Sequence, residues 1–572
     1  MTFLLDPYAA RSCPVKTFNA FDPGTPKPEK PLDESLLEAF SGGSEFRESM
    51  LEALCRGNGV IDLRDEGHTP AETLAAMDAG TPVIVGGRLP VDVAGHRTGS
   101  PDALVRGSDR PGGRPGYWPV RVKPYRLLEE QRNAKELRAS RLASPTVLEP
   151  LPGYRFRSYR QGVLLELAHH WRLLQACGRS AATPVVGSIG FDNHNRGMIV
   201  WVPLELRFLR TFSRTSASGH RLRSALERYD HEHGFRVHVA QQAMTREPDD
   251  PRPPAVRPIR VPECEWCAWW ETCRPRMDDD DISLRISKTP LDVRELQTLM
   301  GLGITTVSQL ADADVEALLP DYLPLTAHRD RSEARLRTAA RRARMLKRGV
   351  ALEKVSVDPI GVPRAPVEVD LDIETDDSDR TYLWGVLLTD RATGKQKYQH
   401  FSTFSYLSPS GELDLAADFA RWLVRLVRKH PGLLVYHYSD YEVVHLRRMA
   451  QRSGHPDLLA ACDLVKEHFV DLFQLVRDNF VAVDGLGLKV VAAKGAGFSW
   501  RDEEPGGLNS QTWFATAVDG GNAAERKAAR RRVLEYNEDD VRATWHVREW
   551  MDRLDAECSA QDDPTTSTAA PG

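Results

Sequence analysis

The stretch Val367-Glu-Val-Asp-Leu-Asp-Ile-Glu374 alternates apolar and acidic residues without interruption. Because successive side chains of a strand point to opposite faces, this period predicts a strand whose apolar residues face the core. Its four acids then share the other face, where successive carboxylates lie roughly 7 Å apart. Carboxylates at that spacing repel each other unless they bracket one or two cations. The alternative interpretation is an edge strand with a solvated acidic face.

The residues that follow predict the element order β-β-β-α-β-α. Further strands are expected at 381–389, 396–403 and 432–438, and helices at 413–429 and 441–451. The segment Tyr438-Ser-Asp-Tyr-Glu442 places a carboxylate where the fourth strand meets its helix. The segment Leu534-Glu-Tyr536-Asn-Glu-Asp-Asp540 is expected to open a late helix, with Tyr536 and Asp540 on one face because they are four residues apart.

This order of elements and acids resembles a ribonuclease-H-like α/β fold, in particular the YprB-type domain of the DEDD exonucleases. The resemblance implies four metal ligands and one further catalytic residue: Asp372, Glu374, Glu442, Asp540 and Tyr536. The family usually has Asp in the second motif, where Glu442 is the candidate here and Asp440 is its rival. Asp471, in another segment that looks like the family, is expected to be structural.

These residue types suit phosphodiester hydrolysis. The reaction requires neutralisation of charge on the phosphate and deprotonation of a water molecule. Two divalent cations about 3.5–4 Å apart supply both, and hard carboxylate oxygens suit Mg²⁺ or Mn²⁺. Tyr536 is expected to orient the attacking water, and the alternative for it is an aromatic side chain that packs at the helix start.

A second pattern is Cys264-Glu-Trp-Cys267-Ala-Trp-Trp-Glu-Thr-Cys273. Three thiols so close together in a reducing compartment predict a metal site, for which either zinc or an iron–sulfur cluster is suitable. The pattern resembles the cysteine triad of RecB-like, CRISPR-associated exonucleases and of the AddB nuclease domain. That resemblance implies a [4Fe–4S] cluster with Cys13 as the fourth ligand. The isolated Cys55, Cys177, Cys462 and Cys558 are expected to be ordinary thiols.

The resemblance also implies a PD-(D/E)XK nuclease core between Cys13 and Cys264, with Asp102 and Lys123 as catalytic residues. The match is partial, because Arg121 and Arg47 stand where the family has acids, and Glu166 and His170 stand where it often has Gln and Tyr. Arginine cannot bind a cation and repels one. We therefore expect a domain that keeps the fold and the cluster but is impaired in catalysis.

The arginines at these positions permit two interpretations. Arg47, Arg121 and Lys123 would favour a phosphate over a metal ion, so the same groove is expected to suit nucleic acid. A shifted register would instead let Glu45 or Glu48 restore the acidic position.

The middle of the chain carries a weaker pattern. Residues 296–310 resemble a helix-hairpin-helix, whose glycine turn at Gly301 and Gly303 lets backbone N–H groups approach a phosphate. Residues 329–348 include nine Lys and Arg residues but only two acids, and residues 527–532 form a second basic run. Such an excess favours a phosphate-facing surface over a merely solvated helix face.

Length and composition indicate several soluble domains. The chain has 572 residues, a net charge of −5 and no apolar run of 18 residues, which excludes a membrane span. Eight cysteines are too few for a disulfide scaffold, and the N-terminus lacks an export signal, so a cytoplasmic location is expected. The expected domains are 1–277 (PD-(D/E)XK-like), 283–350 (helix-hairpin-helix and basic helix) and 360–556 (ribonuclease-H-like), followed by a disordered tail at 559–572.

The whole pattern resembles RecB-like nucleases fused to a YprB-type exonuclease domain. It predicts a metal-dependent nuclease, in particular a 3′–5′ exonuclease of the DEDD class, that acts in DNA repair or processing. DNA is expected as the partner over RNA. The rival hypothesis is a nucleic-acid-binding adaptor with a structural iron–sulfur cluster and no turnover.

Overall fold

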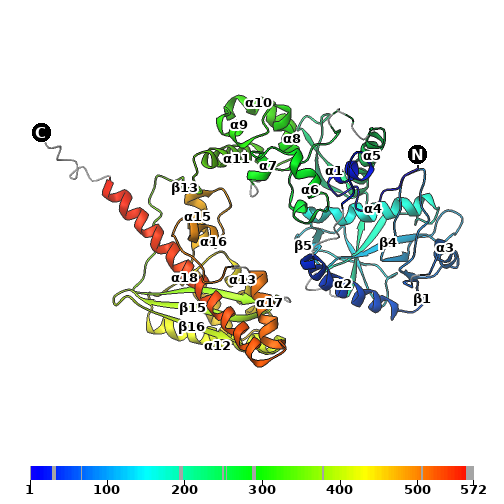
Figure 1. Ribbon diagram of the computed structural model, residues 1–572. Helices are drawn as coiled ribbons and strands as arrows, with labels where there is room; N and C mark the ends of the chain where they lie inside the picture. The colour runs from blue at the N-terminus through cyan, green and yellow to red at the C-terminus, as the bar shows by residue number, and fades with distance from the viewer. Residues whose placement is uncertain are drawn as a thin grey trace. The chain divides into compact units, whose positions relative to one another are not determined.

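A computed structural model describes residues 2–28, 34–65, 67–191, 197–247, 250, 252, 254–286, 291–376, 379–503 and 507–561 (Figure 1). The chain is a mixed α/β protein that divides into two compact units. Unit 1 comprises Met1–Arg285, Leu291–Thr306 and Asp314–Leu336, and unit 2 comprises Ile286–Pro290, Val307–Ala313 and Arg337–Gly572. The border runs through the central helices, so the segment predicted as a separate helix-hairpin-helix domain contributes to both units.

Unit 1 is built on an eight-stranded mixed sheet with the order β1-β2-β3-β4-β9-β10-β6-β7. Its strands are β1 (Val60–Asp62), β2 (Val83–Val85), β3 (Ala103–Arg106), β4 (Tyr117–Val122), β6 (Arg138–Arg141), β7 (Glu149–Pro150), β9 (Val185–Ile189) and β10 (Met198–Pro203). Two small antiparallel pairs flank it: β5 (Leu128–Glu130) with β8 (Tyr154–Phe156), and β11 (Arg207–Phe212) with β12 (His220–Ser224).

Some of the helices of unit 1 pack on its sheet. The helices of the unit are α1 (Pro14–Phe21), α2 (Glu34–Cys55), α3 (Pro70–Asp78), α4 (Gln161–Ala176), α5 (Ala225–Met244), α6 (Trp270–Cys273), α7 (Ile282–Arg285), α8 (Val293–Gly301) and α10 (Val315–Thr326). Helix α4 packs on β4 and β9, and α5 packs on α1 and α4. The near-continuous apolar runs of β3 and β4 are buried in cores to which α2, α3 and α4 contribute.

Unit 2 contains a five-stranded sheet with the order β16-β15-β14-β17-β18. Its strands are β14 (Val367–Thr375), β15 (Thr381–Asp390), β16 (Lys395–Ser402), β17 (Leu434–His437) and β18 (Phe469–Asp471). The predicted order β-β-β-α-β-α is confirmed. The edge-strand alternative is wrong, because β14 lies at the centre of the sheet, antiparallel to β15 and parallel to β17.

Unit 2 also contains helices and short strands outside this sheet. They are α9 (Val307–Asp312), β13 (Leu352–Lys354), α12 (Pro409–Lys429), α13 (Tyr441–Ser453), α14 (Pro456–His468), α15 (Leu472–Asn479), β19 (Phe480–Ala482), α16 (Leu488–Lys494), α17 (Gly507–Asp519) and α18 (Ala523–Gln561). Helix α11 (Ser332–Lys347) crosses the border between the units.

The two faces of β14 have different neighbours, as its alternation predicts. Val369, Leu371 and Ile373 are buried in a core that includes residues of α12. The acidic face is covered by α18, which packs on β14 and β15 (Figure 1). The acids of β14 are therefore enclosed rather than solvated.

Arg548 of α18 neutralises the first half of this acidic face. Its Nε and Nη2 atoms donate to the two carboxylate oxygens of Asp370 at 2.9 and 3.0 Å, and its Nη1 atom donates to Glu368 at 2.5 Å. All three side chains are fully buried. A bidentate guanidinium–carboxylate pair is strongly directional, so it determines where α18 lies on the strand.

Several sequence expectations are corrected by the structure. The late helix α18 begins at Ala523, so Leu534 to Asp540 lie within it and do not open it. Strand β13, which the sequence does not predict, pairs antiparallel with β19. Helix α18 extends to Gln561, so the predicted tail begins inside the helix, and 562–572 lie outside the described residues.

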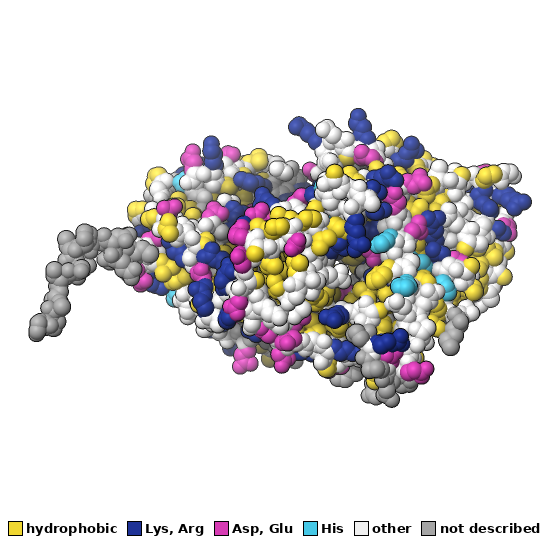
Figure 2. All heavy atoms as spheres, turned by 90° about the horizontal axis from the view of Figure 1, so that it is seen from above, with side chains coloured by type: hydrophobic (Ala, Val, Ile, Leu, Met, Phe, Trp, Pro, Cys, Tyr) yellow, Lys and Arg dark blue, Asp and Glu magenta, His cyan; other side chains and the backbone are white. Residues whose placement is uncertain are grey.

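The basic run around α11 is less available to phosphate than its composition indicates. Arg335 pairs with Glu295, Arg341 and Arg348 pair with Glu353, and Lys347 pairs with Asp312. On the face shown in Figure 2, basic and acidic side chains are interspersed. Among the described residues, no helix combines the length and the apolar character that crossing a bilayer requires.

Replacement of Arg548 by Met should destabilise unit 2. The variant leaves Glu368 and Asp370 buried without their guanidinium, which costs about 3–5 kcal/mol for a buried pair that loses one partner. Urea unfolding of the full chain, followed by circular dichroism, measures this loss. The control is Arg477→Met, since Arg477 pairs with Asp478 on the surface and such pairs contribute about 0–1 kcal/mol. Equal unfolding midpoints for the two variants would contradict the role assigned to Arg548.

Candidate functional site

Three carboxylates meet at the end of the acidic face, two from β14 and one from α18. One carboxylate oxygen each of Asp372, Glu374 and Asp540 lie within 4.8 Å of one another. Oxygens on opposite sides of a Mg²⁺ ion, each bound at 2.0–2.1 Å, are about 4.2 Å apart. The spacing of the three oxygens is therefore compatible with a shared divalent cation.

Each carboxylate is oriented by a hydrogen bond from a neighbouring side chain. Asn537 Nδ2 donates to Asp372 Oδ2, Ser510 Oγ donates to Glu374 Oε2, and Trp500 Nε1 donates to Asp540 Oδ1, each at 2.7 Å. Each donor engages one oxygen of a group that has two. The three neutral donors hold the carboxylates in place without cancelling their charge.

The close approach of Asn537 depends on a glycine. Gly385 of β15 pairs with Asp372 across the sheet, and a Cβ atom at Gly385 would lie 1.6 Å from Asn537 Oδ1. Asn537 Oδ1 also accepts a hydrogen bond from Tyr398 Oη at 2.8 Å. Any larger residue at Gly385 would therefore displace the side chain that orients Asp372.

The electrostatics of the cluster favour added positive charge. Burial raises the pKa of Asp372 well above its usual range, and repulsion from Asp540 and Glu374 raises it further. Burial and the charge of Asp540 raise the pKa of Glu374 to about 8, and burial raises the pKa of Asp540 to about 6. Without a cation the carboxylates retain protons that a cation would displace.

Tyr536 lies one turn before Asp540 on α18, as predicted, and has a lysine beside it. Lys489 Nζ, at the start of α16, donates to Tyr536 Oη at 3.0 Å. Because an ammonium group only donates, the phenol oxygen accepts here and its own proton points elsewhere. The charge of Lys489 also lowers the pKa values of Glu374 and Asp540. No motif in the sequence marks Lys489.

Glu442 lies near this group but not within it. The residue is buried at the start of α13, and its Oε2 atom has no hydrogen-bond partner among the described residues. Burial, followed by the charges of Asp471 and Asp440, raises its pKa to about 8. Its charge in turn raises the pKa of Asp372. The rival residue Asp440 is exposed just before α13.

Asp471 has contacts typical of a structural residue. Its Oδ1 atom accepts a hydrogen bond from Phe473 N at 2.9 Å, which caps α15, and another from Ser439 N at 3.0 Å. Ser439 has a positive φ of 85° at the corner between β17 and α13. Asp471 therefore stabilises the turn that leads to Glu442.

The candidate catalytic acids of unit 1 form ion pairs with Arg and Lys side chains. Asp102 accepts hydrogen bonds from Arg47 Nε at 2.8 Å and from Arg121 Nη1 at 3.1 Å. Lys123 Nζ donates to Glu166 Oε2 at 2.8 Å. Glu48, which a shifted register would bring to the site, pairs with Arg64 instead. No group of three potential ligands that includes Asp102 is close enough to hold a metal ion among the described residues.

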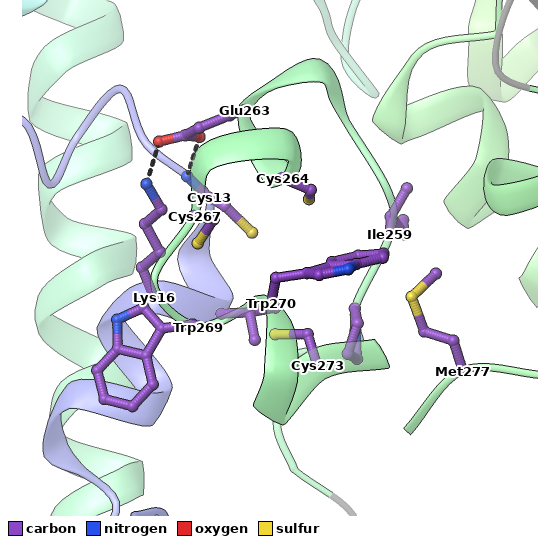
Figure 3. Close-up of a pocket in the computed structure, with 12 residues that line it drawn as sticks. Cys13, Lys16, Ile259, Glu263, Cys264, Cys267, Trp269, Trp270, Cys273 and Met277 are labelled. Atoms are coloured by element: carbon purple, nitrogen blue, oxygen red, sulfur yellow. Dashed lines mark hydrogen bonds and ion pairs between the residues drawn. The ribbon is translucent and has the colours of Figure 1, made fainter. Parts of the chain in front are cut away.

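Four cysteines, one from the N-terminal segment and three from residues 264–273, line one cavity (Figure 3). They are Cys13, Cys264, Cys267 and Cys273. The N-terminal segment is held to the cysteine segment by Cys13 N and Lys16, which both bind Glu263, and by Asn19, which donates to Cys273 Sγ at 3.6 Å. Trp269 and Trp270 line the same cavity (Figure 3).

Burial raises the pKa of the thiols of Cys13, Cys264 and Cys273, in the last case to about 11. No three sulfur atoms of the four cysteines lie within 4.8 Å of one another. A single tetrahedral zinc, with Zn–S bonds of about 2.3 Å, would hold its sulfurs about 3.8 Å apart. The observed arrangement is wider than a zinc site.

Residues 369–552 match the family model of the RNase H superfamily. The matched segment lies in unit 2 and contains Asp372, Glu374, Glu442 and Asp540. No curated protein matches the chain. Unit 2 therefore contains a ribonuclease-H-like domain, which indicates a nuclease that binds nucleic acid, and its acidic triad is able to hold a divalent metal ion.

The raised pKa values predict a pH-dependent effect of divalent cations on stability. Without cations, a folded Glu374 with a pKa of about 8 binds its proton more tightly than the unfolded residue does. Stability should then fall as pH rises from about 5 to 8, by roughly 1.4 kcal/mol per pH unit for each such group. Thermal unfolding in EDTA and in Mn²⁺ at several pH values measures this.

In that experiment Mn²⁺ should stabilise the chain more at pH 8 than at pH 6, because the cation replaces protons. The variant Glu374→Gln, which cannot ionise at this position, should show a smaller difference between the two pH values. A Mn²⁺ effect that is independent of pH would show that the three carboxylates are not its ligands.

Proposed function

We propose that this chain is a metal-dependent nuclease of the DEDD exonuclease class, with its active site in unit 2. The observation that carries the proposal is the convergence of Asp372, Glu374 and Asp540 within 4.8 Å inside the ribonuclease-H-like domain. The hydrogen-bond donors of these acids support it. Asp372, Glu374 and Asp540 receive neutral donors, whereas Asp370, which has a structural role, is paired with the guanidinium group of Arg548.

In this proposal Asp372, Glu374 and Asp540 hold Mg²⁺ or Mn²⁺, with Glu442 completing a second position. Bound cations would neutralise phosphate charge and lower the pKa of a water molecule. The Oε2 atom of Glu442 suits such a role. It lies 3.7 Å from His437 Nδ1 but accepts no hydrogen bond among the described residues, and a buried carboxylate oxygen without a donor is costly unless it binds a cation.

The neighbouring side chains have separate tasks. Asn537, Ser510 and Trp500 keep the carboxylates oriented, as neutral donors outside the ligand set commonly do. Tyr536 orients the attacking water through its hydroxyl group. Lys489 is positioned to bind a substrate phosphate when its contact with Tyr536 is released, because an ammonium group is a point donor to phosphate oxygens.

For unit 1 we propose a RecB-like, PD-(D/E)XK-type domain that is impaired in cation-dependent catalysis. The ion pairs of Asp102 and Glu166 support this, because Arg47, Arg121 and Lys123 occupy the positions where cations would bind. We further propose a helix-hairpin-helix around Gly303, whose φ of 83° forms the turn after α8. DNA is the proposed substrate, in repair or processing, and the cytoplasm is the proposed location.

The rival proposal is an adaptor that binds nucleic acid without cleaving it. The ion-paired acids Asp102 and Glu166 of unit 1 are consistent with an adaptor. The acidic triad of unit 2, which is arranged to hold a metal ion, is not. Wild-type protein that binds oligonucleotides but leaves them intact in both Mg²⁺ and Mn²⁺ would favour the adaptor.

Cleavage should depend on the acidic triad. The variants Asp372→Asn and Asp540→Asn keep the side-chain shape and remove a ligand charge, so cleavage should fall at least about 1,000-fold, equivalent to roughly 4 kcal/mol. End-labelled single- and double-stranded DNA and RNA, incubated with Mg²⁺ or Mn²⁺, give the rate, the polarity and the substrate class. Oligonucleotide affinity in EDTA should be retained.

The matched control for these variants is Asp478→Asn, an exposed carboxylate of the same unit that should leave cleavage unchanged. Equal cleavage by the wild type, Asp372→Asn and Asp540→Asn would place any nuclease activity elsewhere. Activity that survives both substitutions but is lost in Lys123→Ala would assign it to unit 1.

We also propose that Cys13, Cys264, Cys267 and Cys273 hold a [4Fe–4S] cluster. Four thiols around one cavity suit iron–sulfur ligation, and their wide spacing favours a cluster, in which each iron has its own thiolate, over a single zinc. Bound in this way, the group would join the N-terminal segment to residues 264–273. The cysteines must lose their protons to bind it.

Anaerobically purified protein should be brown, absorb broadly near about 400 nm and contain about four irons per chain. The variant Cys273→Ser should lose the colour and lower the thermal stability of unit 1, whereas Cys177→Ser should leave both unchanged. Colourless wild-type protein with one zinc per chain would reject the cluster in favour of the zinc alternative.

A further inference from the structure

Unit 1 contains a cluster of charged residues that the proposed nuclease reaction does not use. We name it the basic cluster. Its members come from five separate segments and are Arg11, Arg47, Asp102, Arg121, Lys123 and Glu166. Arg47 lies on α2, Arg121 on β4 and Glu166 on α4, so the cluster is assembled by the sheet and the helices around it.

The cations of the basic cluster bind its two carboxylates in a chain. Arg47 Nε and Arg121 Nη1 donate to Asp102 at 2.8 and 3.1 Å. Lys123 Nζ donates to Glu166 at 2.8 Å, Arg121 Nε lies 3.5 Å from the same carboxylate, and Arg11 pairs with its other oxygen. Both carboxylates are thereby satisfied from several sides.

The charges of the basic cluster do not balance. Four cationic side chains surround two carboxylates, which leaves an excess of two positive charges in a partly buried place. His170 lies one turn after Glu166 and does not change this balance. Burial and the nearby Arg121 and Lys123 hold its pKa well below the usual value, so the ring is neutral.

The arrangement of exposure directs this excess charge outward. Asp102 and Glu166 have exposed side-chain fractions of 1% and 0%, whereas Arg11 and Arg47 have fractions of 36% and 44%. A ligand that approaches from solvent therefore meets guanidinium groups, with the carboxylates behind them. Guanidinium groups at such a position match the geometry of phosphate oxygens.

An exposed aromatic ring adjoins the basic cluster. Tyr8 Oη accepts a hydrogen bond from Arg121 Nη2 at 2.9 Å, and the residue as a whole is 44% exposed. The Arg11 guanidinium lies 5.4 Å from the centre of this ring. A solvent-facing aromatic ring beside cationic groups is the arrangement on which a base stacks while its phosphate is bound.

We propose that the basic cluster is a phosphate-binding site for a nucleic-acid strand, with Arg11 and Arg47 as its outer ligands and Tyr8 as its stacking surface. It rests on the proposed function only in taking nucleic acid as the source of the phosphate. The acidic triad of unit 2 consists of three carboxylates and favours a cation, whereas the basic cluster favours an anion. The two units would thus bind the same polymer differently, one through cations and one through arginines.

Site-specific cross-linking tests the proposal in the full chain. A short oligonucleotide with a photoreactive base is irradiated with the protein in EDTA, and cross-linked peptides are identified by mass spectrometry. Wild-type protein should cross-link at the peptide that contains Tyr8. The double variant Arg11→Gln, Arg47→Gln should reduce this yield at least about fivefold, because two outer charges are lost. Arg172→Gln, an ion-paired residue of α4 outside the basic cluster, is the control and should leave the yield unchanged.

A variant with the opposite expected effect makes the test sharper. Glu166→Gln raises the excess positive charge of the basic cluster and should increase the yield of the Tyr8 cross-link. If Glu166 were instead a metal ligand, the substitution would not increase this yield. Thermal unfolding verifies that each variant is folded. If Glu166→Gln does not fold, the arginine variants still decide the matter.

Competition distinguishes the sources of the phosphate. Inorganic phosphate, compared with chloride at equal ionic strength, should reduce the cross-link if a free phosphate suffices, and oligonucleotides with and without a 5′-phosphate separate a terminal from a backbone phosphate. A wild-type chain without a Tyr8 cross-link, or an arginine double variant with an unchanged yield, would overturn the proposal. Because the assay runs without cations, an absence of cleavage in unit 2 would leave its result intact.

Discussion

The pair formed by Arg548 with Asp370 is the contact on which the site of unit 2 depends. It holds α18 across the acidic face of β14 in one register, with Glu368 as a second acceptor. Nearer the start of the same helix, Asn537 and Asp540 contact the later acids of the strand, Asp372 and Glu374. A helix side chain from far along the chain is thereby placed beside two strand side chains. The same pair neutralises the first two acids, so the uncompensated charge is confined to the last two.

The chain uses buried carboxylates in two opposite ways. In unit 2, Asp372, Glu374 and Asp540 receive neutral donors and keep their mutual repulsion, which raises their pKa values and favours an added cation. In unit 1, Asp102 and Glu166 are surrounded by guanidinium and ammonium groups. The balance of neighbouring charge, rather than the presence of acids, decides whether such a site attracts a metal ion or an anion.

The candidate site was predictable from the sequence only in part. The alternation of β14 identified Asp372 and Glu374, and the spacing of Tyr536 and Asp540 identified one helix face. Lys489, Ser510 and Trp500 carried no signal, because each lies in a separate segment and reaches the site only through the fold. The same limit explains why the edge-strand alternative stayed open and why the start of one helix was predicted wrongly. A strand pattern does not show whether the strand is central or at an edge, and the charged first turns of α18 concealed where that helix begins.

The sequence by itself determined the local period of each element, the identity of the acids and thiols, and the order in which they occur. Those properties depend on neighbours within a few residues, where side-chain direction follows directly from backbone geometry. Only the tertiary structure decided which charges face one another. It paired Glu368 and Asp370 with Arg548, left Asp372 and Glu374 to Asp540, and gave Asp102 to Arg47 and Arg121. Electrostatic energy depends on distance in space and on burial, and neither is written in the spacing of residues along a chain.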